Sequence, residues 1–189
     1  MKLMTNVLEG RAVLVLTSNF GTETDEIQRP LATLREAGAT VTVAATETGT
    51  VQTLVVDHDL GPEVPVDTTY DSVQAGDFDA VVLPGGTLNA DALRTDETVR
   101  SLVKAFAGSG KPVAAICHAP WVLIEAGLAD GRRLTSVDTI RTDLVNAGAQ
   151  WSDQEVVLDD STGFRLITSR NPGDLDAFGA AIIDALSQA

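Results

Sequence analysis

The stretch Lys111-Pro112-Val113-Ala114-Ala115-Ile116-Cys117-His118-Ala119-Pro120-Trp121 carries the only cysteine of the 189-residue chain, directly after a short apolar run. The run predicts a buried strand, and helix-forming residues follow at once. A reactive side chain on the sharp turn between such a strand and a helix is a nucleophile elbow. The positive end of the helix dipole favours thiolate, the reactive form of the sulfur. We therefore predict that Cys117 is a nucleophile and that His118 is its base or proton carrier.

Around this turn, short apolar strands alternate with segments of helical periodicity. Strands are expected over residues 13–16, 41–44, 78–83 and 113–116, with a small β excursion over 49–66 that turns at Gly49 and Gly61-Pro62. Helices are expected over 23–37, 97–107 and 175–186, and another follows the elbow to about residue 126. A further helix carries Val137, Ile140, Leu144 and Val145, and a hairpin joins 156–158 to 164–168. This alternation predicts an α/β fold with a mostly parallel sheet covered on both faces. The length fits one domain over residues 11–189, after a polar, weakly ordered lead-in over 1–10.

Several polar or flexible residues directly follow predicted strands. Glu23, Gly85-Gly86 and Cys117 all do so, and in this fold class the chemistry gathers outside the carboxyl ends of the strands. A Glu23 carboxyl beside the sulfur would have a raised pKa and could donate a proton to the thiolate. Glu26 lies on nearly the same helix face, so the pattern does not choose between the two acids.

Backbone N–H groups near the elbow are candidates for stabilising an oxyanion. Gly85 and Gly86 form a turn whose N–H groups can approach a substrate closely, and the N–H of His118 is a further donor. The sequence thus predicts a backbone oxyanion site beside the cysteine.

Composition limits the possible partners. One cysteine and two histidines leave no internal disulfide and too few ligands for a structural zinc, iron–sulfur or histidine-rich metal site, and no cofactor motif is present, so we expect neither metal nor cofactor. The net charge of −14 argues against nucleic acid and anionic membranes as partners. Without a signal peptide or a bilayer-length apolar run, the protein is expected to be soluble and cytoplasmic.

The combined motifs resemble those of the PfpI family of intracellular cysteine peptidase-like proteins. This family belongs to the wider glutamine-amidotransferase-like superfamily that includes the Parkinson-linked deglycase. The matching segments are LPGG at 83–86, GKPVAAICHAP at 110–120, GRRLTS at 131–136 and TSRNPGDL at 168–175. The resemblance extends from residue 11 to the C-terminus, although Ala119 stands where the family usually has glycine.

The resemblance implies a flavodoxin-like three-layer α/β sandwich with a nucleophile elbow. It implies Cys117 as nucleophile, His118 as its neighbour in the catalytic set, and Glu23, seven residues before Pro30, as the carboxyl contacting the sulfur. It also implies homodimers or higher homo-oligomers. In these, an acid after the Pro-Gly-Gly turn of a neighbouring subunit, here Asp91, can complete the triad.

Two enzymatic chemistries and one non-catalytic function are compatible with this site. The favoured function is stress-protective attack on carbonyl carbon, either of methylglyoxal, as in a glyoxalase III, or of its adducts on proteins, as in a deglycase. An intracellular cysteine peptidase is the alternative, disfavoured because no third group in the chain evidently orients His118. A redox-responsive stress protein using Cys117 is the other. No histidine follows His118, which excludes a glutamine amidotransferase, and no residues remain for a fused DNA-binding domain.

Overall fold

A seven-stranded sheet forms the centre of the computed structural model, which describes residues 6–188. Its strand order is β11-β12-β8-β7-β1-β3-β6. The strands are β1 (Ala12–Leu16), β3 (Thr40–Ala45), β6 (Thr68–Thr69), β7 (Ala80–Leu83), β8 (Val113–Ile116), β11 (Val156–Asp159) and β12 (Leu166–Ser169). Every neighbouring pair is parallel except the β11–β12 hairpin. The predicted α/β fold with a mostly parallel sheet is therefore confirmed.

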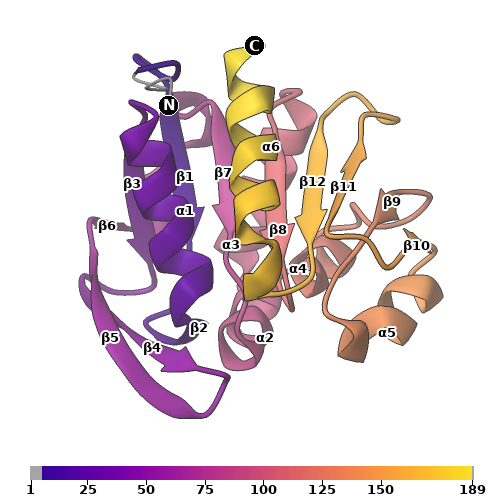
Figure 1. The fold of residues 1–189 in the computed structure, drawn as a ribbon, viewed down its shortest axis with the longest axis horizontal. Helices are drawn as coiled ribbons and strands as arrows, with labels where there is room; N and C mark the ends of the chain where they lie inside the picture. The colour runs from indigo at the N-terminus through magenta and orange to yellow at the C-terminus, as the bar shows by residue number, and fades with distance from the viewer. Residues whose placement is uncertain (1–5, 189) are drawn as a thin grey trace.

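Helices cover both faces of this sheet (Figure 1). One face packs against α1 (Thr24–Glu36) and α6 (Leu175–Ser187), and the other against α2 (Thr87–Thr95), α3 (Glu97–Gly108), α4 (Pro120–Glu125) and α5 (Arg141–Asn146). Alternate strand residues face opposite sides, so Leu14 and Leu16 join the second layer whereas Val13 and Val15 join the first. No helix within residues 6–188 is long and apolar enough to cross a bilayer.

A second sheet of three strands lies beside the carboxyl edge of the central one (Figure 1). It contains β2 (Phe20–Glu23), β4 (Gly49–Val55) and β5 (Asp59–Val66). The predicted turn at Gly61-Pro62 is wrong, because both residues lie within β5 and the β4–β5 hairpin turns between them and β4, at residues 56–58. Since β5 pairs only with β4, it is an edge strand, where a proline is tolerated.

Several shorter elements were not expected. The residues of strand β2 and helix α2 show no clear hydrophobic periodicity in the sequence. Strand β9 (Arg133–Leu134) pairs with β10 (Gln150–Trp151) in a small parallel sheet. Short 3₁₀ turns occupy Tyr70–Ser72, Ala75–Asp77, Asp138–Ile140 and Pro172–Asp174, and the third leads into α5 in place of one continuous helix. The expected weakly ordered lead-in is partly wrong, because Leu8 is fully buried against α1, whereas residues 1–5 lie outside the described residues.

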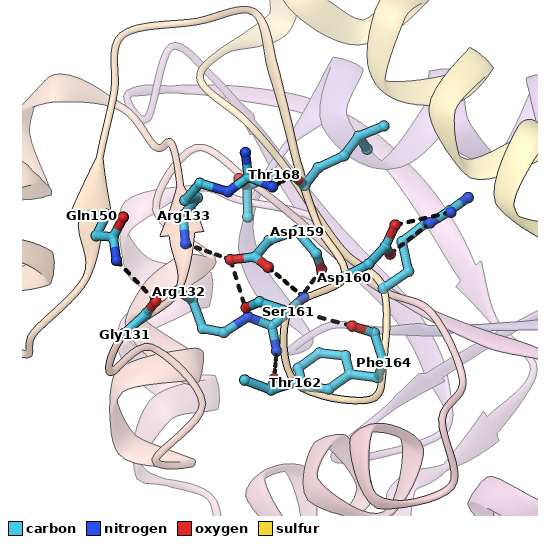
Figure 2. A network of polar contacts seen from close by, with 12 residues as sticks. Gly131, Arg132, Arg133, Gln150, Asp159, Asp160, Ser161, Thr162, Phe164 and Thr168 are labelled. Atoms are coloured by element: carbon cyan, nitrogen blue, oxygen red, sulfur yellow. Dashed lines mark hydrogen bonds and ion pairs between the residues drawn. The ribbon is translucent and has the colours of Figure 1, made fainter.

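The β11–β12 hairpin is joined to the β9 segment by a buried ion pair (Figure 2). Arg132 is 2% exposed, and its Nη2 donates to the carbonyl oxygens of Asp159 at 2.7 Å and Phe164 at 3.2 Å. Burial alone would raise the pKa of Asp159, but hydrogen bonds from Ser161 and the Arg133 N–H, with the Arg132 charge, hold that pKa at about 2. The pair is therefore ionised, and each charge depends on its partner.

Candidate active site

Cys117 occupies a sharp turn directly after β8. Its φ of 63° is in the left-handed region, where a non-glycine residue is uncommon and typical of a functional site. The Cys117 N–H donates to the Ser169 carbonyl at 3.1 Å, and the Cys117 carbonyl accepts the Val137 N–H at 3.0 Å. Helix α4 begins at Pro120. The strand–turn–helix geometry predicted for the elbow is present, and backbone bonds on both sides hold it.

Glu26 is the carboxyl beside the Cys117 side chain. It is fully buried, and its Oε2 accepts the Gly85 N–H at 2.9 Å. A Cβ placed on Gly85 would lie 2.3 Å from Glu26 Oε2 and 2.6 Å from Cys117 Cβ, so both groups border the same glycine. Burial, with a smaller contribution from the charge of Glu23, raises the pKa of Glu26 to about 8. The hydrogen bond with the Cys117 thiol lowers this pKa but does not cancel the effect of burial. At neutral pH this carboxyl is mostly protonated and can donate to the sulfur.

The predicted contact between Glu23 and the sulfur is wrong. The Glu23 carboxylate accepts the N–H groups of Val56 and Asp57, both at 3.1 Å, at the tip of the β4–β5 hairpin. Glu23 is the last residue of β2 and lies just before α1. Its side chain is directed to the β4–β5 hairpin and is not part of the α1 face that packs on the sheet. Glu26 and Pro30, four residues apart, share that buried face.

His118 lies between the cysteine and two threonines. Its Nδ1 is 3.2 Å from Cys117 Sγ, and its Nε2 is 3.2 Å from Thr87 Oγ1 and 3.3 Å from Thr139 Oγ1. The ring packs against Trp121. Burial lowers the pKa of His118, although the charge of Asp57 opposes that shift. A neutral imidazole at this distance can accept the proton of the thiol.

Two of the predicted oxyanion donors have other roles. The Gly85 N–H is occupied by Glu26, and the Gly86 N–H interacts with the sulfur of Cys117. The backbone N–H of His118 has no protein acceptor within residues 6–188, so it is the donor that remains available to an oxyanion. The prediction is therefore corrected for Gly85, because its N–H positions the buried carboxyl.

Burial of Cys117 opposes the ionisation that the helix dipole led us to expect. Cys117 is only 7% exposed, and burial raises its pKa, while the Gly86 N–H opposes this shift. The charge of Glu26 would raise the pKa further once that carboxyl ionises, which happens above neutral pH. Helix α4 has only six residues, so its dipole is weak. Ionisation therefore depends on proton transfer to His118 and on a neutral Glu26.

The remaining candidate and two unexpected residues lie near the Pro-Gly-Gly turn. Asp91 is exposed on α2, and its role toward a neighbouring subunit stays a prediction. Thr87, which directly follows Gly86, bonds to Asp57 through both its N–H and its hydroxyl. Sequence reasoning missed Thr87 and Asp57, because only the hairpin geometry brings them to His118. Within residues 6–188, no group of three or more histidine, cysteine or acidic side chains is arranged to hold a metal ion.

Comparison with known proteins identifies the family. The profile of the DJ-1/PfpI family matches residues 11–185. The chain belongs to the DJ-1/PfpI family. Deglycase TK1284 of Thermococcus kodakarensis is 42% identical over 166 residues, covering 88% of this chain and 93% of that protein. The putative cysteine protease YraA of Bacillus subtilis is 40% identical over 175 residues, covering 93% of this chain and 96% of that protein.

The DJ-1/PfpI fold is also evident from solved structures. The crystal structure of Drosophila melanogaster DJ-1beta superposes with a TM-score of 0.82 at 35% identity, covering 95% of this chain and 91% of that chain. The three-layer, flavodoxin-like architecture implied by the resemblance is therefore confirmed.

Replacing Gly85 with alanine is expected to disrupt the site of this DJ-1/PfpI protein. The added Cβ would approach Glu26 Oε2, Cys117 Cβ and the Ile116 carbonyl, the last at 2.8 Å. Overpacking of this kind costs about 1–3 kcal/mol. We expect a lower melting temperature and slower alkylation of the cysteine by iodoacetamide. Gly108→Ala is the control, because its Cβ meets no atom within 4 Å; equal behaviour of the two variants would contradict the predicted clash.

Replacing Glu26 with glutamine is expected to change how stability varies with pH. The folded protein keeps the Glu26 proton up to about pH 8, whereas the unfolded chain releases it near the ordinary glutamate pKa of 4.5. Stability from this group is present below pH 4.5 and is lost as pH rises through 8, a loss of a few kcal/mol. Urea unfolding at about pH 5 and about pH 8 should show a smaller loss for Glu26→Gln than for the wild type. Glu36→Gln, exposed on the same helix, should keep the wild-type slope, and the same slope in Glu26→Gln would refute the shift.

Proposed function

We propose that this protein is a cysteine-dependent enzyme that attacks carbonyl carbon, acting on methylglyoxal or on its adducts with proteins. The observation that carries the proposal is the position of Cys117 Sγ 3.2 Å from Nδ1 of a neutral His118. The protonated Glu26 next to Cys117 supports it, because it favours the thiolate once the thiol proton has moved to His118. The deglycase name of a relative that is 42% identical adds further support.

The chemistry follows from these groups. His118 Nδ1 takes the thiol proton as the sulfur bonds to the aldehyde carbon. The aldehyde oxygen becomes negative and accepts a hydrogen bond from the backbone N–H of His118. With methylglyoxal the product of addition is a hemithioacetal. Transfer of hydrogen from the aldehyde carbon to the neighbouring ketone carbon gives a thioester, which water cleaves to lactate. The aldehyde carbon is oxidised and the ketone carbon reduced, so the overall reaction adds only water.

The peptidase alternative gains support from one observation. Thr87 and Asp57 lie beyond His118 in the same chain, and they supply the orienting group whose apparent absence disfavoured a hydrolytic triad. The redox-sensor alternative loses support, because a buried thiol with a raised pKa is a poor target for peroxide.

The deciding experiment incubates the reduced protein with methylglyoxal and measures lactate, with an unstructured peptide and a glycated peptide as parallel substrates. Thiol-dependent lactate, or release of the sugar-derived adduct, supports carbonyl chemistry. Peptide cleavage alone supports the peptidase, and inactivity toward all three substrates overturns the proposed enzyme.

We also propose a cytoplasmic, homo-oligomeric protein in which Asp91 approaches the His118 of a neighbouring subunit. A reducing compartment suits a catalytic thiol. Exposed apolar side chains near the site, including Leu88 on the same helix as Asp91 and Phe20 on β2, suit an interface between copies. Sedimentation equilibrium tests the assembly, and a strict monomer at micromolar concentration would oppose it.

A further inference from the structure

The tip of the β4–β5 hairpin touches the catalytic pair through one threonine. Thr87 is the first residue of α2; its N–H donates to Asp57 Oδ1 at 2.7 Å, and its hydroxyl donates to Asp57 Oδ2 at 2.8 Å. The same hydroxyl oxygen is 3.2 Å from His118 Nε2. Asp57, Thr87, His118 and Cys117 thus form a continuous series of polar contacts within one chain.

We propose that Asp57 is a positioning residue that sets the proton arrangement of His118 through Thr87. This proposal rests on the proposed function for its effect on turnover, but it concerns the reactivity of the thiol itself. It assigns to the chain its own acid for the Cys117–His118 pair, in addition to any acid from a neighbouring subunit.

The direction of the hydrogen bonds carries the argument. An ionised carboxylate only accepts, so the hydroxyl proton of Thr87 is directed to Asp57. The oxygen of Thr87 then accepts from His118 at the nearer ring nitrogen, Nε2, at 3.2 Å against 3.5 Å for Nδ1, which places the imidazole proton on Nε2. The Thr139 oxygen, 3.3 Å from Nε2, can share this proton as a second acceptor. The lone pair of Nδ1 consequently faces the sulfur at 3.2 Å, as a base that removes the thiol proton requires. After that transfer, the charge of Asp57 stabilises the imidazolium.

The hairpin tip is built to hold Asp57 in place. Val56 and Asp57 have φ values of 55° and 56°, and a β-branched residue such as valine rarely adopts this left-handed conformation. Such strain persists where surrounding contacts enforce it. Here the Glu23 carboxylate enforces it by accepting both N–H groups. Glu23 therefore supports the site from a distance.

The test is the pH dependence of Cys117 alkylation by iodoacetamide in Asp57→Asn. The asparagine amide donates to Thr87, which turns the hydroxyl proton toward His118 and leaves the imidazole proton facing the sulfur. The alkylation rate at neutral pH is expected to fall about 10- to 100-fold, at or below the lower end of the usual contribution of a general base, because the base is misplaced and not removed. The midpoint of the pH profile is expected to rise in Thr87→Val, which keeps the Asp57 charge; in Asp57→Asn the loss of a charge that raises the pKa of Cys117 acts in the opposite direction. The charged groups that act on the Cys117–His118 pair are Glu26 and Asp57, and Glu23 acts indirectly by raising the pKa of Glu26. The control variants keep all three groups.

Two variants of Thr87 separate proton placement from simple loosening of the hairpin. Thr87→Val removes the hydroxyl but keeps the backbone bond to Asp57, and it should show the same loss as Asp57→Asn. The double variant should lose no more than either single variant, because both act through one contact. Thr87→Ser restores a hydroxyl and should restore the rate.

Asp59→Asn is the matched control, because it makes the same charge change on the same hairpin. Asp59 is exposed and contacts His58, not Thr87, so its alkylation profile should match the wild type. The proposal is overturned if Asp57→Asn or Thr87→Val alkylates like Asp59→Asn. Because iodoacetamide needs no carbonyl substrate, this result stands even if the wild type forms no lactate, and absence of lactate bears only on the proposed function. In turnover, kcat should fall with little change in KM.

Discussion

Replacing Cys117 with serine is expected to reduce lactate formation from methylglyoxal to background, a loss of at least about 10³-fold in kcat. A hydroxyl ionises far less readily than a thiol, and His118 alone does not compensate for this difference. Serine is similar in size, so the turn and its bonds to Ser169 and Val137 should remain. The measurement is lactate released at neutral pH from equal amounts of folded wild type and variant.

Asp59→Asn serves again as the control in this assay, since it lies outside the contacts of the site. An unchanged melting temperature of the serine variant would assign the loss to chemistry. Lactate formation at the wild-type rate would remove Cys117 from the mechanism. If the wild type cleaves peptides instead, the same variant should lose that activity, so the choice of substrate and the role of the thiol are decided separately.

Replacing Arg132 with methionine is expected to cost about 3–5 kcal/mol of folding free energy, because it leaves the Asp159 carboxylate buried without its charge partner. Asp159 is 1% exposed and accepts the Arg133 N–H at 2.6 Å and the Ser161 N–H at 2.7 Å. Those bonds remain, but the guanidinium that also packs on the Phe164 ring is lost. Urea unfolding at neutral pH measures the change.

Arg133→Met is the matched control for this prediction. The Arg133 side chain is exposed and donates only to the Leu158 carbonyl, whereas its backbone N–H, which methionine keeps, is the group that contacts Asp159. We expect a change below about 1 kcal/mol for Arg133→Met. A loss of similar size in both variants would show that the buried pair adds nothing beyond ordinary surface contacts.

The elbow could be predicted because its signals are local. The apolar run before Cys117 and the proline at the start of α4 specify a strand, a turn and a helix within a few residues. The choice between Glu23 and Glu26 could not be made, because it depends on where α1 begins after the unexpected strand β2. Helical spacing alone gives both carboxyls nearly the same direction.

Other features depend on tertiary structure and left no local signal. The turn of the β4–β5 hairpin falls at Val56 and Asp57, which do not favour left-handed backbone, instead of at Gly61-Pro62. Long-range bonds to Glu23 override that preference. The raised pKa of the Cys117 thiol likewise follows from burial, which the sequence does not specify.

The backbone bonds of Cys117 have a consequence for synthesis of the protein. Both partners of the strained turn, the Val137 N–H and the Ser169 carbonyl, come from residues that leave the ribosome after the cysteine. A growing chain that ends before β12 contains Val137 but not Ser169, so only one of the two bonds that hold the left-handed conformation can form. The backbone bonds that hold the nucleophile are therefore complete only when the last strand of the sheet takes its place.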